Sequence, residues 1–134
     1  MTVSVSKRRL MLSVDLPIVL TNKNDGQSKH WTGSARERKT IQEVLFDLRR
    51  EPFNERVDIV VTRILGKGQS LWDADSIGRG NAKQLIDSLV AMGWFADDGP
   101  QYIRNCDYRQ DENQRKQWPR GATRVEVYSS DGED

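Results

Sequence analysis

The sequence contains only one cysteine, Cys106, and one histidine, His30. A lone cysteine cannot form an internal disulfide, so a reducing compartment is expected. A zinc site of the usual cysteine and histidine type is excluded, and a serine–histidine–aspartate triad would require His30. His30 lies in a polar stretch, where it either helps to position a phosphate or a water, or is simply exposed to solvent.

Long apolar segments are also missing. No run approaches the roughly 18 apolar residues that a membrane span requires, so no membrane association is expected. The apolar stretch after Lys7 is interrupted by Asp15 and Pro17 and lacks a small-residue cleavage site. We therefore do not expect a signal peptide.

No charge of one sign predominates, because 21 basic residues face 20 acidic ones in a chain of 134. That length suits a single compact domain over residues 1–134. The charge balance argues against a generic polybasic nucleic-acid binder but is compatible with a local basic face. Such a face would have to be assembled by folding, and a solvated surface is the alternative for most of the scattered basic residues, which are Arg36, Arg38, Lys39, Lys67, Arg79, Arg115, Lys116 and Arg120.

Hydrophobic periodicity predicts four strands and two helices in the order β-α-β-α-β-β. This order predicts an α+β (mixed α/β) fold with a small mixed sheet, one face of which a homodimer would cover. The predicted strands are residues 8–15, 57–65, 102–108 and 123–129. The helices run from Ser34 to about Pro52 and over residues 81–92, with polar loops at 21–33 and 109–117 and an acidic tail at 130–134.

Local signals place the ends of these elements. Pro17 ends the first strand or marks a sheet edge. Asn81 is a plausible N-cap of the second helix, and Gly93 is a natural residue just beyond its C-terminus. In the first helix, one apolar stripe is expected, formed by Ile41, Val44, Leu45 and Leu48.

Two carboxylates, Asp73 and Asp75, follow the second predicted strand and are two residues apart. In an extended segment such residues project to the same side, so their oxygens can share one cation. Asp98, or its neighbour Asp97, could complete the site from beyond the second helix. Mg²⁺ prefers such hard oxygen ligands, and Mn²⁺ is an alternative. The alternative is that Asp73, Asp75, Asp97 and Asp98 are turn residues that bind no metal.

Lys83 falls in the first turn of the second predicted helix, where the free N–H groups already favour an anion. A phosphate would be held there by both the helix N-terminus and the lysine. A surface ion pair between Lys83 and Asp87 is the alternative. Leu71 and Trp72, directly before Asp73, could stack on bases of opened DNA, or one of them packs in the core.

Three other motifs were compared with this region. The EF-hand calcium loop matches at Asp73, Asp75 and Gly78, but Ile77 and Gln84 occupy two positions that need oxygen ligands. The phosphate-loop pattern is absent, and the dinucleotide fingerprint fails because Lys83 occupies its third glycine position. A calcium-binding interaction module therefore remains only as an alternative.

Taken together, the segment 73–98 resembles the RusA-type Holliday junction resolvases of phages and prophages. That family has Asp-x-Asp-Asn after a hydrophobic strand, then a lysine-led helix that ends in Asp-x-Leu, a glycine and Asp-Asp. The matching residues here are Asp73, Asp75, Lys83, Asp87, Leu89, Gly93, Asp97 and Asp98.

The resemblance implies a homodimeric Mg²⁺-dependent endonuclease that acts on branched DNA such as four-way junctions, in the cytoplasm of a bacterium or phage-infected host cell. It implies Asp73, Asp75 and Asp98 as metal ligands and catalytic residues, with Lys83 as the essential cation. Asp97 is an alternative ligand. For DNA contact we single out Lys83, Arg79, Asn81, Trp72 and Lys67.

The sequence departs from the family pattern at one place. Ser76 replaces the family's asparagine, and residues 77–80 look like an insertion before Asn81. The longer spacing puts the role of Lys83 in doubt more than the metal site. A non-catalytic DNA-binding protein that retains the resolvase fold is therefore the second hypothesis.

Overall fold

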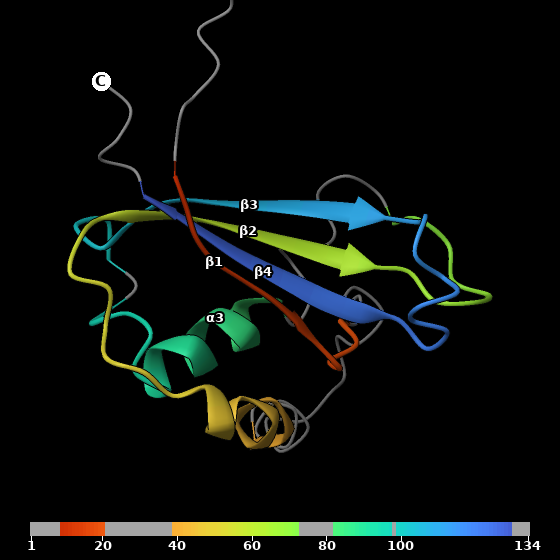
Figure 1. Cartoon of the computed structure of the whole chain (residues 1–134), viewed down its shortest axis with the longest axis horizontal. Helices are drawn as coiled ribbons and strands as arrows, with labels where there is room; N and C mark the ends of the chain where they lie inside the picture. The colour runs from red at the N-terminus through yellow and green to blue at the C-terminus, as the bar shows by residue number, and fades with distance from the viewer. Residues whose placement is uncertain (1–8, 21–38, 73–81, 98, 130–134) are drawn as a thin grey trace, which may run out of the picture.

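The computed structural model describes residues 9–20, 39–72, 82–97 and 99–129. Its four strands form one sheet in the order β1-β4-β2-β3, in which only β2 and β3 are parallel (Figure 1). The predicted α+β fold, with a mixed four-stranded sheet and two helices, is confirmed. The elements are β1 (Leu10–Leu16), η2 (Phe46–Leu48), β2 (Val57–Ile64), α3 (Ala82–Ala91), β3 (Ile103–Asp111) and β4 (Ala122–Ser129), and residues 39–45 are helical ahead of η2.

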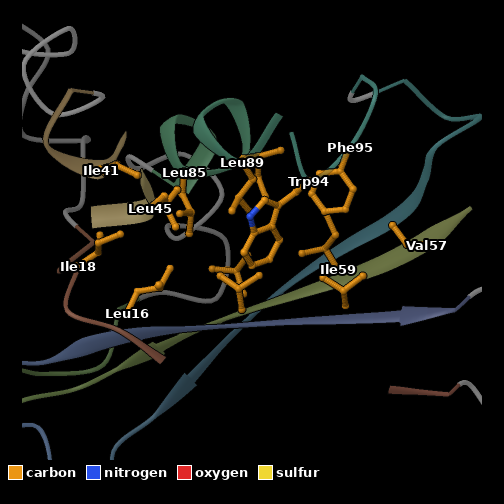
Figure 2. Close-up of a cluster of buried hydrophobic side chains, with 14 of the residues drawn as sticks. Leu16, Ile18, Ile41, Leu45, Val57, Ile59, Leu85, Leu89, Trp94 and Phe95 are labelled. Carbon is orange, nitrogen blue, oxygen red and sulfur yellow. The ribbon is translucent and has the colours of Figure 1, made fainter. Parts of the chain in front are cut away.

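Both helices lie on the same side of the sheet, and the hydrophobic core lies between them and the strands (Figures 1 and 2). Alternate residues of β2, such as Ile59 and Val61, point into this core and are fully buried. Leu85 and Leu89 of α3 meet them from the helix side. Every residue of β2 is buried, as predicted for a strand that is covered on both faces.

The C-terminus of α3 is closed by backbone hydrogen bonds at the predicted glycine. Gly93 has a φ of 89°, and its N–H donates to the carbonyl of Val90. The N–H of Trp94 reaches back to the carbonyl of Leu89. This pair of bonds is the Schellman motif, which favours glycine because other side chains rarely adopt such a φ.

The first helix ends earlier than predicted. Ile41 and Leu45 are buried and Val44 packs against the core, but Leu48 is exposed, so its predicted place on the apolar stripe is wrong. The helix tightens into η2 and stops at Leu48, because the backbone becomes extended at Arg49. Leu48 is tied to the fold through its carbonyl oxygen, which accepts a hydrogen bond from the Trp94 indole.

The third strand is longer than predicted. Its final residues, 109–111, were expected to belong to a loop, but they pair with residues 62–64 of β2. The side chains of these three residues are all polar, so they gave no hydrophobic strand signal, although they pair with β2 at the edge of the sheet. The other strands match the prediction to within one or two residues, and β1 stops at Leu16, directly before Pro17.

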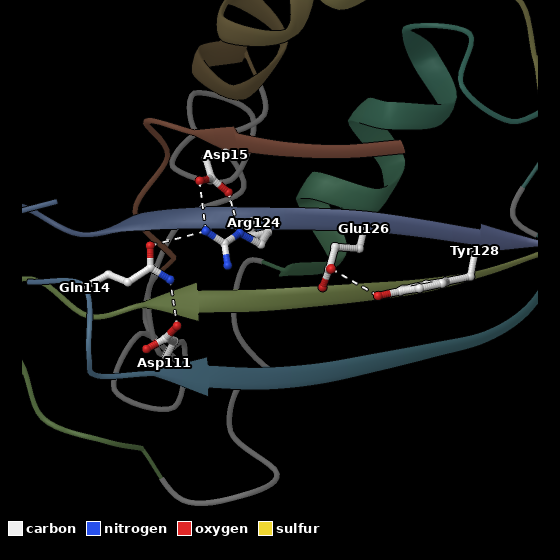
Figure 3. A network of polar contacts seen from close by, with 6 residues as sticks. All are labelled: Asp15, Asp111, Gln114, Arg124, Glu126 and Tyr128. Carbon is white, nitrogen blue, oxygen red and sulfur yellow. Dashed lines mark hydrogen bonds and ion pairs between the residues drawn. The ribbon is translucent and has the colours of Figure 1, made fainter. Parts of the chain in front are cut away.

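The sheet face that the described helices do not cover carries a polar network (Figure 3). The guanidinium of Arg124 donates to both oxygens of Asp15, at 2.6 and 3.0 Å. Arg124 also contacts the side chain of Gln114, which donates to Asp111. On the same face, Asp58 is almost fully buried and receives two hydrogen bonds from Arg104, at 2.6 and 3.0 Å.

No helix within the described ranges is long and apolar enough to cross a lipid bilayer.

Candidate functional site

Most of the predicted metal site lies outside the residues that the structure describes. This applies to Asp73, Asp75 and Asp98, and also to Arg79 and Asn81. The described residues contain no group of three or more histidine, cysteine or acidic side chains that could hold a metal ion. The predicted convergence of carboxylates therefore stays a prediction.

Lys83 is the second residue of α3, so its backbone lies in the first helical turn as the sequence predicted. Asp97 is exposed and lies in the turn between α3 and β3. The carbonyl of Gly99 in this turn accepts hydrogen bonds from the N–H groups of Tyr102 and Ile103, so the turn sits at the amino end of β3.

Trp72, the residue before the first predicted metal ligand, is held at the carboxyl end of β3. The backbone of Trp72 exchanges two hydrogen bonds with the side chain of Gln110, at 2.9 and 3.0 Å. Gln110 is the penultimate residue of β3. With a rise of about 3.3 Å per residue, Ile103 and Gln110 lie roughly 23 Å apart. Trp72 and Asp97 are thus anchored near opposite ends of the β2–β3 pair.

Arg63 forms the base of the cluster around Trp72. It is 95% buried, since only 5% of its surface is exposed, and it occupies the same face of β2 as Ile59 and Val61. Its guanidinium lies 3.7 Å from the centre of the Trp72 ring. One terminal nitrogen donates to the carbonyl of Ser70 and to the side-chain oxygen of Gln110, at 2.9 and 2.8 Å. Trp72 thereby packs against the core, while Leu71 is exposed.

No carboxylate in the described part of the chain pairs with Arg63. Its hydrogen-bond acceptors are neutral oxygens, and the nearest charge that affects it is a second cation, Arg115. Burial, followed by repulsion from Arg115, lowers the pKa of Arg63. An arginine retains its proton even so, and therefore Arg63 and Arg115 are two positive charges close together among the described residues.

Arg115 holds two loops together. One of its terminal nitrogens donates to the carbonyls of Gly66 and Gln69, at 2.6 and 2.7 Å. The N–H of Lys67 donates to the carbonyl of Pro119 at 2.7 Å. The loop after β2 and the loop after β3 therefore form one connected surface.

Gly66 is essential to this close approach. A β-carbon at this position would come within 2.5–2.6 Å of backbone atoms of Pro119, Arg120 and Gly121. Such contacts would force the two loops apart.

Further cations project from these loops. Lys67, Lys116 and Arg120 are all exposed. A groove of about 540 Å³ lies beside Arg120, and its walls are mostly apolar. The groove is lined by Pro17, Val19, Trp118, Pro119, Arg120 and Gly121.

Sequence reasoning named Lys67 and Trp72 for this region but missed Arg63, Gln110 and the bridging role of Arg115. A signal for Arg63 was present, since it is a basic residue on the same strand face as the apolar residues Val57, Ile59 and Val61. Nothing in the sequence indicates that Gln110 binds the backbone of Trp72, because the two residues are far apart in the chain.

No protein-family model matches the chain, and a search of curated proteins finds no match either.

Proposed function

We propose that the chain is a Mg²⁺-dependent, structure-selective endonuclease that cleaves four-way junctions or other branched DNA, as its resemblance to the RusA-type resolvases implies. Asp73, Asp75 and Asp98 are the proposed ligands, with Asp97 as an alternative. Their carboxylate oxygens suit Mg²⁺ chemically. Bound there, Mg²⁺ would lower the pKa of a water and offset charge on the scissile phosphate. Lys83 would hold a phosphate oxygen at the start of α3.

One observation carries the proposal. Trp72, the residue directly before Asp73, is held in a fixed position by Gln110 and Arg63. That position lies beside positive charge that no described carboxylate neutralises. A catalytic carboxylate benefits from a rigid attachment, and a phosphate backbone is attracted to the unneutralised charge.

The proposed cellular context follows from the same resemblance. The enzyme would act as a homodimer in the cytoplasm, so that two sites could make paired nicks across a two-fold junction.

The decisive experiment is the substitution Asp75→Asn, assayed with a labelled four-way junction and a linear duplex, with and without Mg²⁺. We expect Mg²⁺-dependent cleavage of the junction by the wild-type chain and none by the variant. Junction binding should persist or improve, because a negative charge near the phosphate is removed. Asp107→Asn, which changes an exposed carboxylate on β3, is the matched control and should cleave normally. Retained cleavage by the Asp75 variant would overturn the assignment.

A second function has specific support. Trp72 and Asp97 lie near opposite ends of β3, and the segment between Asp75 and Lys83 is longer than in the resolvase pattern. Both observations favour a non-catalytic DNA-binding protein that retains the fold. This alternative predicts junction binding by the wild-type chain without cleavage at any Mg²⁺ or Mn²⁺ concentration.

A further inference from the structure

The loops that follow β2 and β3 differ from the rest of the described chain in their charge. Residues 63–72 and 111–121 contain five cations, Arg63, Lys67, Arg115, Lys116 and Arg120, and two acids, Asp111 and Glu112. Asp111 is engaged within its own loop, since it accepts hydrogen bonds from the N–H of Asn113 and the side chain of Gln114. The net charge of this strand-end surface, defined as these two loops with Arg63, is therefore clearly positive.

The strand-end surface is also preorganised. Arg115 ties the first loop through the carbonyls of Gly66 and Gln69, and the Gln69 side chain accepts from the N–H of Gly66 and donates to the carbonyl of Arg120. These bonds fix the backbone that carries the exposed cations. Fixed charges bind a rigid polyanion with less loss of conformational entropy than mobile ones.

An unpartnered donor group lies beneath this surface. The two hydrogen bonds of Arg63 both use the same terminal nitrogen, and the remaining N–H groups of this buried guanidinium have no described acceptor. Buried polar groups are normally satisfied, so an exception calls for an explanation. An oxyanion bound by the exposed cations above it would place negative charge near this guanidinium.

The groove beside Arg120 adds a second kind of contact. Trp118 and Pro119 give it an apolar wall, while Arg120 adds a cation at the same place. Phosphate contacts on cations, together with an apolar or aromatic wall for sugar and base, are the usual components of a sequence-independent nucleic-acid site.

The geometry points to the strand-end surface as a binding site for the phosphate backbone of DNA, contacted by Lys67 and Arg120 and supported from beneath by Arg63 and Arg115. This inference deepens the proposed function and rests on it, because it names the surface that holds an arm of the branched substrate. The surface includes Trp72, the last described residue before Asp73 in the chain.

The test uses the full chain with Asp75→Asn, so that binding can be measured without cleavage. Binding of a fluorescent four-way junction is followed by anisotropy over a range of salt concentrations, with and without the added pair Lys67→Gln and Arg120→Gln. Each phosphate contact contributes a slope of about −0.9 to log K against log salt. We expect the double change to make the slope shallower by about 2 and to weaken binding about 60-fold at 0.1 M salt.

The matched control removes two other exposed arginines, Arg49 and Arg50, which lie over the rings of Phe46 and Phe53. It lowers the net charge by the same amount and should leave the slope almost unchanged. Thermal unfolding of each variant checks that the fold is intact. Equal weakening by both pairs, or none by the loop pair, would overturn the inference.

The two proposals can fail separately. If the wild-type chain cleaves junctions but the loop pair leaves the slope unchanged, the surface assignment is wrong and the nuclease stands. If the chain cleaves nothing but the loop pair reduces the slope as expected, the surface stands and the catalytic assignment fails. A chain with no affinity for DNA overturns both.

Discussion

The arginines on the two faces of the sheet differ in the charge of their hydrogen-bond partners. On the face without described helices, Arg104 and Arg124 each form two hydrogen bonds to a carboxylate, Asp58 and Asp15 respectively. On the helix-covered face, Arg63 is more deeply buried than either, yet it binds only neutral oxygens and the ring of Trp72. The most deeply buried of these three arginines is therefore the one that has no carboxylate partner among the described residues.

The arginine side chain therefore has two different roles in this fold. A guanidinium paired with a carboxylate satisfies a buried charge and mainly serves the fold. A buried guanidinium without an anionic partner leaves a positive potential in its surroundings, and an external anion can use that potential. Side chains point alternately to the two faces of the sheet along β3. Gln110 and Asp111 therefore lie on opposite faces, and only the neutral Gln110 side chain is directed toward Arg63.

The largest effect on stability is expected from a substitution at Arg104. We expect Arg104→Met to lower the free energy of unfolding by about 3 kcal/mol, because Asp58 would remain buried without its guanidinium. Chemical denaturation measures the change. Arg109→Met, at an exposed position on the same strand, is the control and should cost less than about 0.5 kcal/mol. Similar losses in both variants would show that the buried pair does not hold the strands together.

A smaller loss is expected at Arg63. Arg63→Met removes two hydrogen bonds and the contact with Trp72 but leaves no buried carboxylate behind, and it relieves the repulsion from Arg115. We expect a loss of about 1–2 kcal/mol by chemical denaturation, clearly less than at Arg104. Added phosphate at constant ionic strength should stabilise the wild-type chain more than this variant. A loss as large as that of Arg104→Met would contradict the distinction between the two faces.

Local signals in the sequence were sufficient for most of the fold. The β-branched run in β2 predicts a fully buried strand, and Gly93 predicts the end of α3, because each depends on residues close together in the chain. The last residues of β3 and the exposure of Leu48 could not be predicted in this way. The first depends on pairing with β2, and the second depends on where the backbone turns away at Arg49.

Less of the candidate site than of the fold could be predicted from local signals in the sequence. The carboxylates and Lys83 were identified from spacing in the sequence, and of these residues only Lys83, at the start of α3, and Asp97, in the turn before β3, lie within the described residues. The partners of Arg63 come from positions 70, 72, 110 and 115, which folding alone brings together. An arginine at an inward-facing position of a β-branched strand could have been noticed, but which described residues surround it is a property of the assembled fold.

The smallest expected effect concerns Asp111, a carboxylate that bonds Asn113 and Gln114 and not the cations of the strand-end surface. Hydrogen bonds from the Asn113 N–H and the Gln114 side chain lower the pKa of Asp111, with a smaller contribution from the positive charge of Arg124. A lowered folded-state pKa stabilises the fold above the ordinary value of about 3.9, and this stabilisation is lost as the pH falls through the folded-state value. Asp111→Asn should therefore flatten the decline of the unfolding temperature below about pH 4 and lower it slightly at neutral pH. The same substitution at Asp107, which receives neither hydrogen bond, is the control. An unchanged acid profile in the Asp111 variant would mean that this carboxylate is not committed to the loop, and it would then be free to neutralise the cations on which the DNA-binding surface depends.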